Sequence, residues 1–289
     1  MKFLAILAAA AQVMTGAAGS SAGGDAARSP MEPHRPPAGY ELVFADEFEA
    51  DGPIDAAKWR FDTHRNQQGW YNNELQYYAA DRSENARVAD GVLTIEALHE
   101  TLAPAPADFG GQGYTSARLV SRGEGWIYGF YEIRAKLPCG RGTWPAIWML
   151  PSDQSVEWPE GGEIDIMEHV GYEPGVIHNS VHTSAFNFQR GTQRTTSYTV
   201  DTACTAFHRY QLLWTPERLV FAVDDAPRFA FEKRRSDRKR WPFDAPMDLL
   251  LNIAVGGDWG GRKGVDDAAF PARMRIDYVR VYQLPGDRK

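Results

Sequence analysis

The chain has 289 residues, of which 43% are hydrophobic and 24% charged, and its formal net charge at pH 7 is −7. This is the composition of a globular protein, and it excludes collagen-like, low-complexity and disordered chains. The acidic balance also argues against a nucleic-acid partner.

The first segment of the chain has the features of an export signal. Lys2 gives a positive start, residues 3–13 form a short apolar stretch, and small residues follow up to Gly24. The stretch is shorter than the roughly 20 apolar residues that span a bilayer. We therefore predict a signal peptide over residues 1–22 and a flexible linker over 23–39. The mature protein is predicted to be secreted, extracellular or periplasmic, without a membrane partner.

The rest of the chain is predicted to form one domain, residues 40–285, because no second linker or internal repeat interrupts it. Alternation of apolar and polar residues predicts strands at residues 92–98, 115–121, 128–137, 177–183, 210–214, 219–223 and 274–282. Gly, Pro and Asp-rich turns separate these runs, and no long amphipathic helix is indicated. The pattern predicts an all-β fold, a β-sandwich of two antiparallel sheets of the jelly-roll kind, with a concave face.

Three acids lie in a run that otherwise has the pattern of a buried strand: Glu163, Asp165 and Glu168. On a regular strand the first two share a face and Glu168 points to the other. A β-bulge near Ile166 or Met167 would return Glu168 to the same face. When carboxylates lie close together, their pKa values differ from one another. Retaining glycoside hydrolysis requires one ionised and one protonated carboxylate. The alternative is a solvated strand face with three unrelated acids.

This segment resembles the bulged Glu-x-Asp-x-x-Glu signature of glycoside hydrolase family 16, in its laminarinase-like (endo-β-1,3-glucanase) branch. The resemblance covers about residues 40–283, and further matching stretches lie at residues 44–48, 70–78, 114–119, 142–150 and 277–282. It implies a concanavalin A-like jelly roll with a substrate cleft. It also implies that Glu163 is the nucleophile, Asp165 its supporting acid and Glu168 the general acid/base.

The activity implied by the resemblance is endo-acting, retaining hydrolysis of β-1,3-glucan by double displacement. A mixed-linkage β-1,3-1,4-glucan or a β-galactan is the alternative substrate, and a non-catalytic β-glucan-binding protein is the alternative outside enzymes. The expected partner is therefore a β-glucan polysaccharide, and the protein is expected to be a monomer.

Aromatic residues near the acids are expected to bind sugar, because the C–H face of a pyranose packs against an indole ring. Trp144 and Trp148, four residues apart, offer two rings to one cleft if they share a strand face, and two core tryptophans are the alternative. By resemblance, the other sugar-binding residues are Asn73, Arg118, Trp158, His182 and Trp259. The tryptophans expected in packing positions are Trp59, Trp126, Trp214 and Trp241.

No cofactor is expected for the chemistry. By resemblance, a structural calcium ion would be held on the convex side by Glu47, the carbonyl oxygen of Gly91 and Asp277, the oxygen ligands that calcium prefers. Ordinary surface carboxylates are the alternative. His178 and His182 have a spacing that a zinc ion accepts, although no matching second pair accompanies them.

Two further features are left open by the sequence. Cys139 and Cys204 form one disulfide after export or remain two separately buried thiols. Residues 183–204 form a long polar insert, which is expected to cap or lengthen one end of the cleft.

Overall fold

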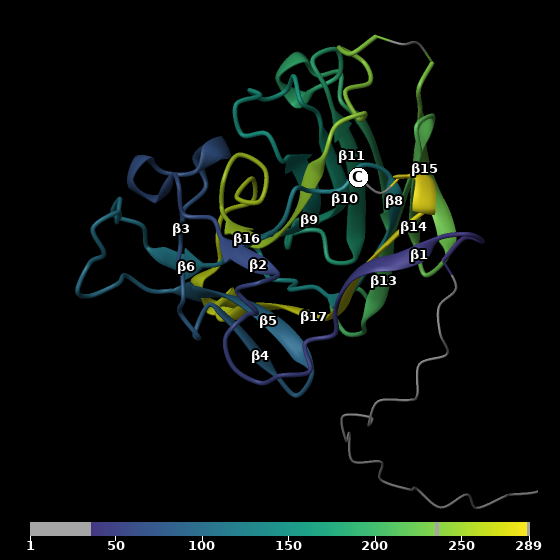
Figure 1. Cartoon of the computed structure of the whole chain (residues 1–289). Helices are drawn as coiled ribbons and strands as arrows, with labels where there is room; N and C mark the ends of the chain where they lie inside the picture. Colours follow the sequence, from purple (N-terminus) through teal and green to yellow (C-terminus); the bar gives the residue numbers. More distant parts are fainter. Residues whose placement is uncertain (1–35, 235–236, 288–289) are drawn as a thin grey trace, which may run out of the picture. The chain divides into compact units, whose positions relative to one another are not determined.

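The computed structural model describes residues 36–234 and 237–287, and the predicted signal peptide lies outside them. These described residues form one compact unit. The described residues fold into two β-sheets with short 3-10 turns between strands (Figure 1). None of their helices is long and apolar enough to cross a membrane. The domain boundaries at residues 22, 39 and 285 stay predictions.

The larger sheet is ten-stranded. Its strands are β1 (Glu41–Asp46), β3 (Gln76–Tyr78), β4 (Ala86–Ala89), β5 (Val92–His99), β6 (Tyr114–Ser116), β8 (Gly129–Lys136), β13 (His208–Trp214), β14 (Arg218–Val223), β15 (Ala226–Glu232) and β17 (Ala272–Gln283). The order is β15-β14-β13-β8-β17-β5-β6-β3, with β1 on β17 and β4 on β5. Neighbours are antiparallel, except that β3 and β6 run parallel.

The smaller sheet is seven-stranded and wholly antiparallel. Its strands are β2 (Trp59–Phe61), β7 (Arg118–Ser121), β9 (Thr143–Pro151), β10 (Glu163–His169), β11 (Val176–His182), β12 (Arg194–Thr199) and β16 (Met247–Val255). The order is β12-β11-β10-β9-β16-β7-β2, which places β10 inside the sheet with a neighbour on each side. The 3-10 turns are η1 (Asn66–Gln68), η2 (Tyr71–Asn73), η3 (Phe188–Arg190), η4 (Asp267–Ala269) and η5 (Pro285–Asp287).

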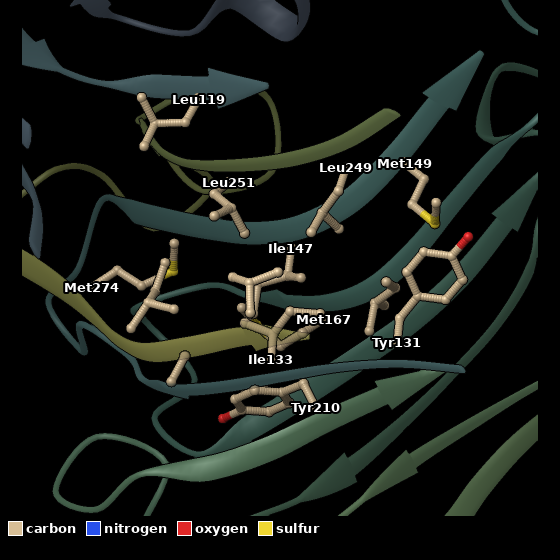
Figure 2. Packing of buried hydrophobic residues seen from close by; sticks show 14 of the residues in the cluster. Leu119, Tyr131, Ile133, Ile147, Met149, Met167, Tyr210, Leu249, Leu251 and Met274 are labelled. Carbon is tan, nitrogen blue, oxygen red and sulfur yellow. The ribbon is translucent and has the colours of Figure 1, made fainter. Parts of the chain in front are cut away.

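The core lies between the two sheets, which confirms the predicted β-sandwich. Figure 2 shows Met167 and Leu251 of the smaller sheet packed with Ile133 and Tyr210 of the larger one, and all four are 0% exposed. Burying one such side chain contributes about 1.5–3 kcal/mol. The tryptophans expected in packing positions lie in this core or against it: Trp59, Trp126, Trp214 and Trp241. The other face of the smaller sheet points away from this core.

One predicted strand differs from the structure. The run at residues 115–121 is divided at Ala117, and β6 belongs to the larger sheet while β7 belongs to the smaller. Both sheets bury one face against the same core, so the apolar alternation continues unchanged where the chain passes from one to the other. The alternation therefore predicts the strands and gives no sign of the change of sheet.

Cys139 and Cys204 form a disulfide, with Cα atoms 5.7 Å apart and a sequence separation of 65. The bond joins the segment after β8 to the segment before β13. Of the two arrangements that the sequence leaves open, the structure shows the cross-linked one.

Removing this cross-link with a Cys139→Ala/Cys204→Ala double substitution is expected to lower the free energy of unfolding by about 3 kcal/mol, since the unfolded chain regains loop entropy. For a domain of this size, about 2–4 °C per kcal/mol makes the melting temperature fall by about 6–12 °C. Thermal denaturation measures the change. The parent protein in reductant should have the same melting temperature as the double variant. Equal melting of oxidised parent and variant would contradict a stabilising role.

Candidate active site

The three acids of β10 share the outer face of the smaller sheet because a bulge changes their register. The pairing shifts between Asp165 and Glu168 against β11, and between Asp165 and Met167 against β9. Ile164 and Met167 are fully buried in the core. Glu163, Asp165 and Glu168 consequently face away from the core together, and the bulge that the sequence predicts is present.

An indole N–H group meets each of the two glutamates. Trp158 Nε1 donates a hydrogen bond to Glu163 Oε2 at 2.8 Å, and Trp144 Nε1 donates one to Glu168 Oε1 at 3.0 Å. Both tryptophans are half-buried rather than core residues. The two rings therefore mark opposite ends of the row of acids, Trp158 at the start of β10 and Trp144 at its end.

His182 lies over the middle of the row, at the end of β11. Its Nε2 is 3.3 Å from Asp165 Oδ2 and 3.9 Å from Glu163 Oε1. His182 is 7% exposed and Asp165 only 1%. The structure thus places His182 directly against Asp165 and Glu163, and its contact with sugar stays a prediction.

Burial raises the pKa values of all three acids, and the charges of neighbouring acids add to the rise at Glu163 and Glu168. Burial, followed by the charge of Asp165, raises the pKa of Glu163 to about 8, and burial raises the pKa of Asp165 to about 7. Burial and the charges of both neighbours hold the pKa of Glu168 well above its usual range. Burial thus favours the protonated form of each carboxyl, and ionisation of one acid hinders ionisation of its neighbours.

Removing each indole N–H is expected to move a different limb of the pH–rate profile. The bond from Trp144 lowers the pKa of Glu168, so Trp144→Phe raises that pKa and moves the alkaline limb of kcat/KM to higher pH. The bond from Trp158 lowers the pKa of Glu163, so Trp158→Phe moves the acid limb to higher pH. Trp126→Phe, remote from the acids, is the control. Parallel movement of both limbs in either variant would contradict this assignment.

Trp148 forms a half-buried ring beside the acids, opposite Asp165 in the β9–β10 register. Its Nε1 donates a hydrogen bond to Asn252 Oδ1 at 2.7 Å. The Arg118 guanidinium lies 4.7 Å from the ring centroid and is ion-paired with Asp62 at 3.0 Å. Arg118 is therefore paired with a carboxylate outside the row of three acids, and its guanidinium lies against the ring of Trp148.

A second aromatic group lies at the Glu168 end of the row. The ring of Trp259 meets Trp144 edge-on at 5.3 Å and His178 at 4.9 Å. Asn73 Nδ2 donates to Asp258 Oδ1 at 2.8 Å, which ties η2 to the Gly-rich loop that carries Trp259. Both residues thus lie in loops beside the acids, and their contacts with sugar stay predictions.

Two residues of the site were not predicted from the sequence. Asn252 interrupts the apolar run of β16, and an amide within such a run is a signal that points to a specific hydrogen bond. Phe188 lies in the polar insert, where no pattern distinguishes it. Its ring centroid is 5.2 Å from that of Trp158.

The proposed calcium ligands are engaged by arginines. Glu47 accepts two bonds from Arg280, at 2.7 and 2.9 Å, and Asp277 accepts one from Arg134 at 2.7 Å. In this conformation both carboxylates are therefore paired with a guanidinium group. The calcium site, completed by the carbonyl of Gly91, stays a prediction.

Comparison with known proteins places this geometry among carbohydrate-degrading enzymes. The sequence profile described as glycosyl hydrolases family 16 matches residues 64–280. A β-glucanase of Rhodothermus marinus is 53% identical over 265 residues, which cover 89% of this chain and 88% of the relative.

Two solved structures show the same fold. The laminarinase from Rhodothermus marinus matches with a TM-score of 0.79 and 52% identity, over 84% of this chain and 97% of that one. A mutant of SCLam, a non-specific endo-β-1,3(4)-glucanase from family GH16, matches with a TM-score of 0.84 and 52% identity. That match covers 87% of this chain and 98% of the other.

Proposed function

The chain belongs to glycosyl hydrolase family 16, and we propose that this glycoside hydrolase is a secreted, endo-acting enzyme that cleaves β-1,3-glucan with retention of configuration. The proposal rests on the row of three acids on β10, which the bulge turns to one face of the sheet. An indole N–H donates a hydrogen bond to the glutamate at each end of the row. The names of the relatives support a β-glucan substrate. One of them, SCLam, is a non-specific endo-β-1,3(4)-glucanase, which makes mixed-linkage glucan the second candidate.

In the first step of the proposed mechanism, Glu163 attacks the anomeric carbon while Glu168 gives its proton to the glycosidic oxygen. The carbon–oxygen bond breaks, the leaving sugar departs as an alcohol, and Glu163 becomes linked to the donor sugar. Burial suits Glu168 for this role because it raises the pKa of the carboxyl well above its usual range and so favours the protonated form.

Asp165 adjusts the charge of the nucleophile. A hydrogen bond between the two side chains lowers the pKa of Asp165 and raises that of Glu163. Attack therefore requires the shared proton to lie on Asp165, and the Trp158 N–H then stabilises the negative charge left on Glu163. The supporting role expected for Asp165 follows from this exchange.

In the second step, the ionised Glu168 takes a proton from water, and the water oxygen attacks the anomeric carbon. The bond to Glu163 breaks, and Glu163 leaves as a carboxylate. Each step inverts the anomeric carbon, so the product keeps the β configuration of the substrate.

Purified protein incubated with laminarin, mixed-linkage glucan, cellulose and galactan is the deciding experiment for the substrate. We expect the fastest release of reducing ends from laminarin, slower release from mixed-linkage glucan, and large oligosaccharides among the early products because cleavage is internal. Absence of cleavage of every β-1,3-linked glucan would contradict the substrate and leave the family assignment standing.

The stereochemistry and the export of the protein have separate tests. Proton NMR of fresh hydrolysate should show β-anomers first, and α-anomers appearing first would overturn the retaining mechanism. N-terminal sequencing of the exported protein should find a mature chain that begins near residue 23.

A further inference from the structure

Phe188 presents an apolar ring to solvent within reach of the active site. The residue is 48% exposed. Its ring centroid lies 5.2 Å from that of Trp158 and 5.8 Å from that of His182. Trp158 in turn donates to the carboxylate of Glu163. One aromatic side chain therefore separates Phe188 from the proposed nucleophile.

The turn that carries Phe188 is fixed by its own hydrogen bonds. Asn187 is 2% exposed, its amide donates to the carbonyl of Thr183 at 3.1 Å, and its Oδ1 accepts from the Arg190 N–H at 3.2 Å. Gly191, with φ of 63°, closes the turn by donating to the carbonyl of Phe188 at 2.9 Å. The turn thus holds the ring in a defined position without covering it.

The sheet order places Phe188 and Trp148 on opposite sides of the acids. His182, which contacts Phe188, ends β11 on one side of β10, whereas Trp148 belongs to β9 on the other. A polymer that lies across β10 with its scissile bond at the acids extends over both sides. It then meets Trp148 in one direction and the pair Trp158–Phe188 in the other.

We propose that Phe188 and Trp158 form an additional sugar-binding subsite, which holds a glucosyl unit of the β-glucan on the side of the acids opposite Trp148. The two rings stand at an interplanar angle of 40°, and this open angle offers an apolar surface to the C–H face of a pyranose. A neutral sugar suits the pair because its binding relies on ring contact rather than on charge. This inference rests on the function proposed above.

End-labelled laminarihexaose tests the subsite, since the position of the label in each product shows which bond was cleaved. Phe188→Ala should raise KM for the hexasaccharide on the order of tenfold, the effect of losing one aromatic contact. It should also move the preferred cleavage point toward one end of the hexasaccharide. Trp148→Ala should move that point toward the opposite end, because the two residues bind opposite parts of the chain.

Two controls separate ring contact from general damage. Phe188→Tyr keeps an aromatic face and should restore the parent's cleavage pattern, and Leu42→Ala, which truncates another exposed apolar residue (53% exposed) outside the site, should leave KM and pattern unchanged. Melting temperatures confirm that each variant is folded. A Phe188→Ala variant with the parent's KM and cleavage pattern overturns the subsite, as does a shift in the same direction as that of Trp148→Ala. Failure of the parent to cleave laminarihexaose would instead contradict the proposed function.

Discussion

Glu168→Ala is expected to reduce laminarin hydrolysis by about 10²–10⁴-fold, the contribution of general acid–base catalysis, while an activated aryl β-glycoside still reacts once. Such a leaving group departs without a proton, so Glu163 is glycosylated and the intermediate accumulates because no base activates water. Mass spectrometry of the intact variant should detect the added sugar. Glu163→Ala removes the proposed nucleophile, and little activity should remain on either substrate.

Azide distinguishes the two variants by the configuration of the product. In Glu168→Ala, azide needs no general base, attacks the glycosyl-enzyme and gives the β-glycosyl azide after two inversions. In Glu163→Ala, azide enters the vacated space, attacks the substrate directly and gives the α-azide after one inversion. Proton NMR of the products reads the configuration. Exchange of the two configurations between the variants would reverse the roles of Glu163 and Glu168.

Glu163→Gln is expected to stabilise the folded protein at alkaline pH. The folded-state pKa of Glu163, about 8, lies above its ordinary value of 4.5 because of burial and the neighbouring Asp165. The parent therefore loses stability as pH rises from about 4.5 to 8, while the uncharged amide does not. At 1.36 kcal/mol per pKa unit, the free energy of unfolding of the variant exceeds that of the parent by about 5 kcal/mol above pH 8, and this difference vanishes near pH 4.

Urea denaturation of parent and variant at about pH 4 and pH 9 measures this difference. Glu157→Gln, which changes an exposed carboxylate near the same strand, is the matched control and should show no pH-dependent gain. The raised pKa of Glu163 would be contradicted if Glu163→Gln gained the same stability at both pH values. It would also be contradicted if the variant were less stable than the parent at pH 9.

The arrangement of the acids could be predicted because two simple constraints act on one short segment. Side chains alternate along a strand, and three acids can share one face only if one extra residue is inserted between Asp165 and Glu168. Trp144 and Trp148 are four residues apart on β9, and their partial exposure agrees with the same alternation of side chains along a strand. Chemistry that depends on neighbours within one strand is thus visible in the sequence.

Features that depend on distant segments were not predictable in this way. The disulfide requires Cys139 and Cys204 to approach across a separation of 65 residues, which is decided by how β8 and β13 pair. The contact between Phe188 and Trp158 likewise depends on the path of a turn. Even the change of sheet at Ala117 leaves the alternation untouched, because one shared core imposes the same pattern on both sheets.

Because β10 lies inside its sheet, changes at the acids and changes at the turn that carries Phe188 have different structural consequences. The acids stand on a strand that is hydrogen-bonded to β9 on one side and β11 on the other, whereas Phe188 stands on a turn between β11 and the edge strand β12. Given the subsite proposed for Phe188, insertions and exchanges at that turn are expected to alter which fragments are produced without displacing the three acids. Descendants of one scaffold can in this way diversify their product spectra while inheriting an unchanged reaction.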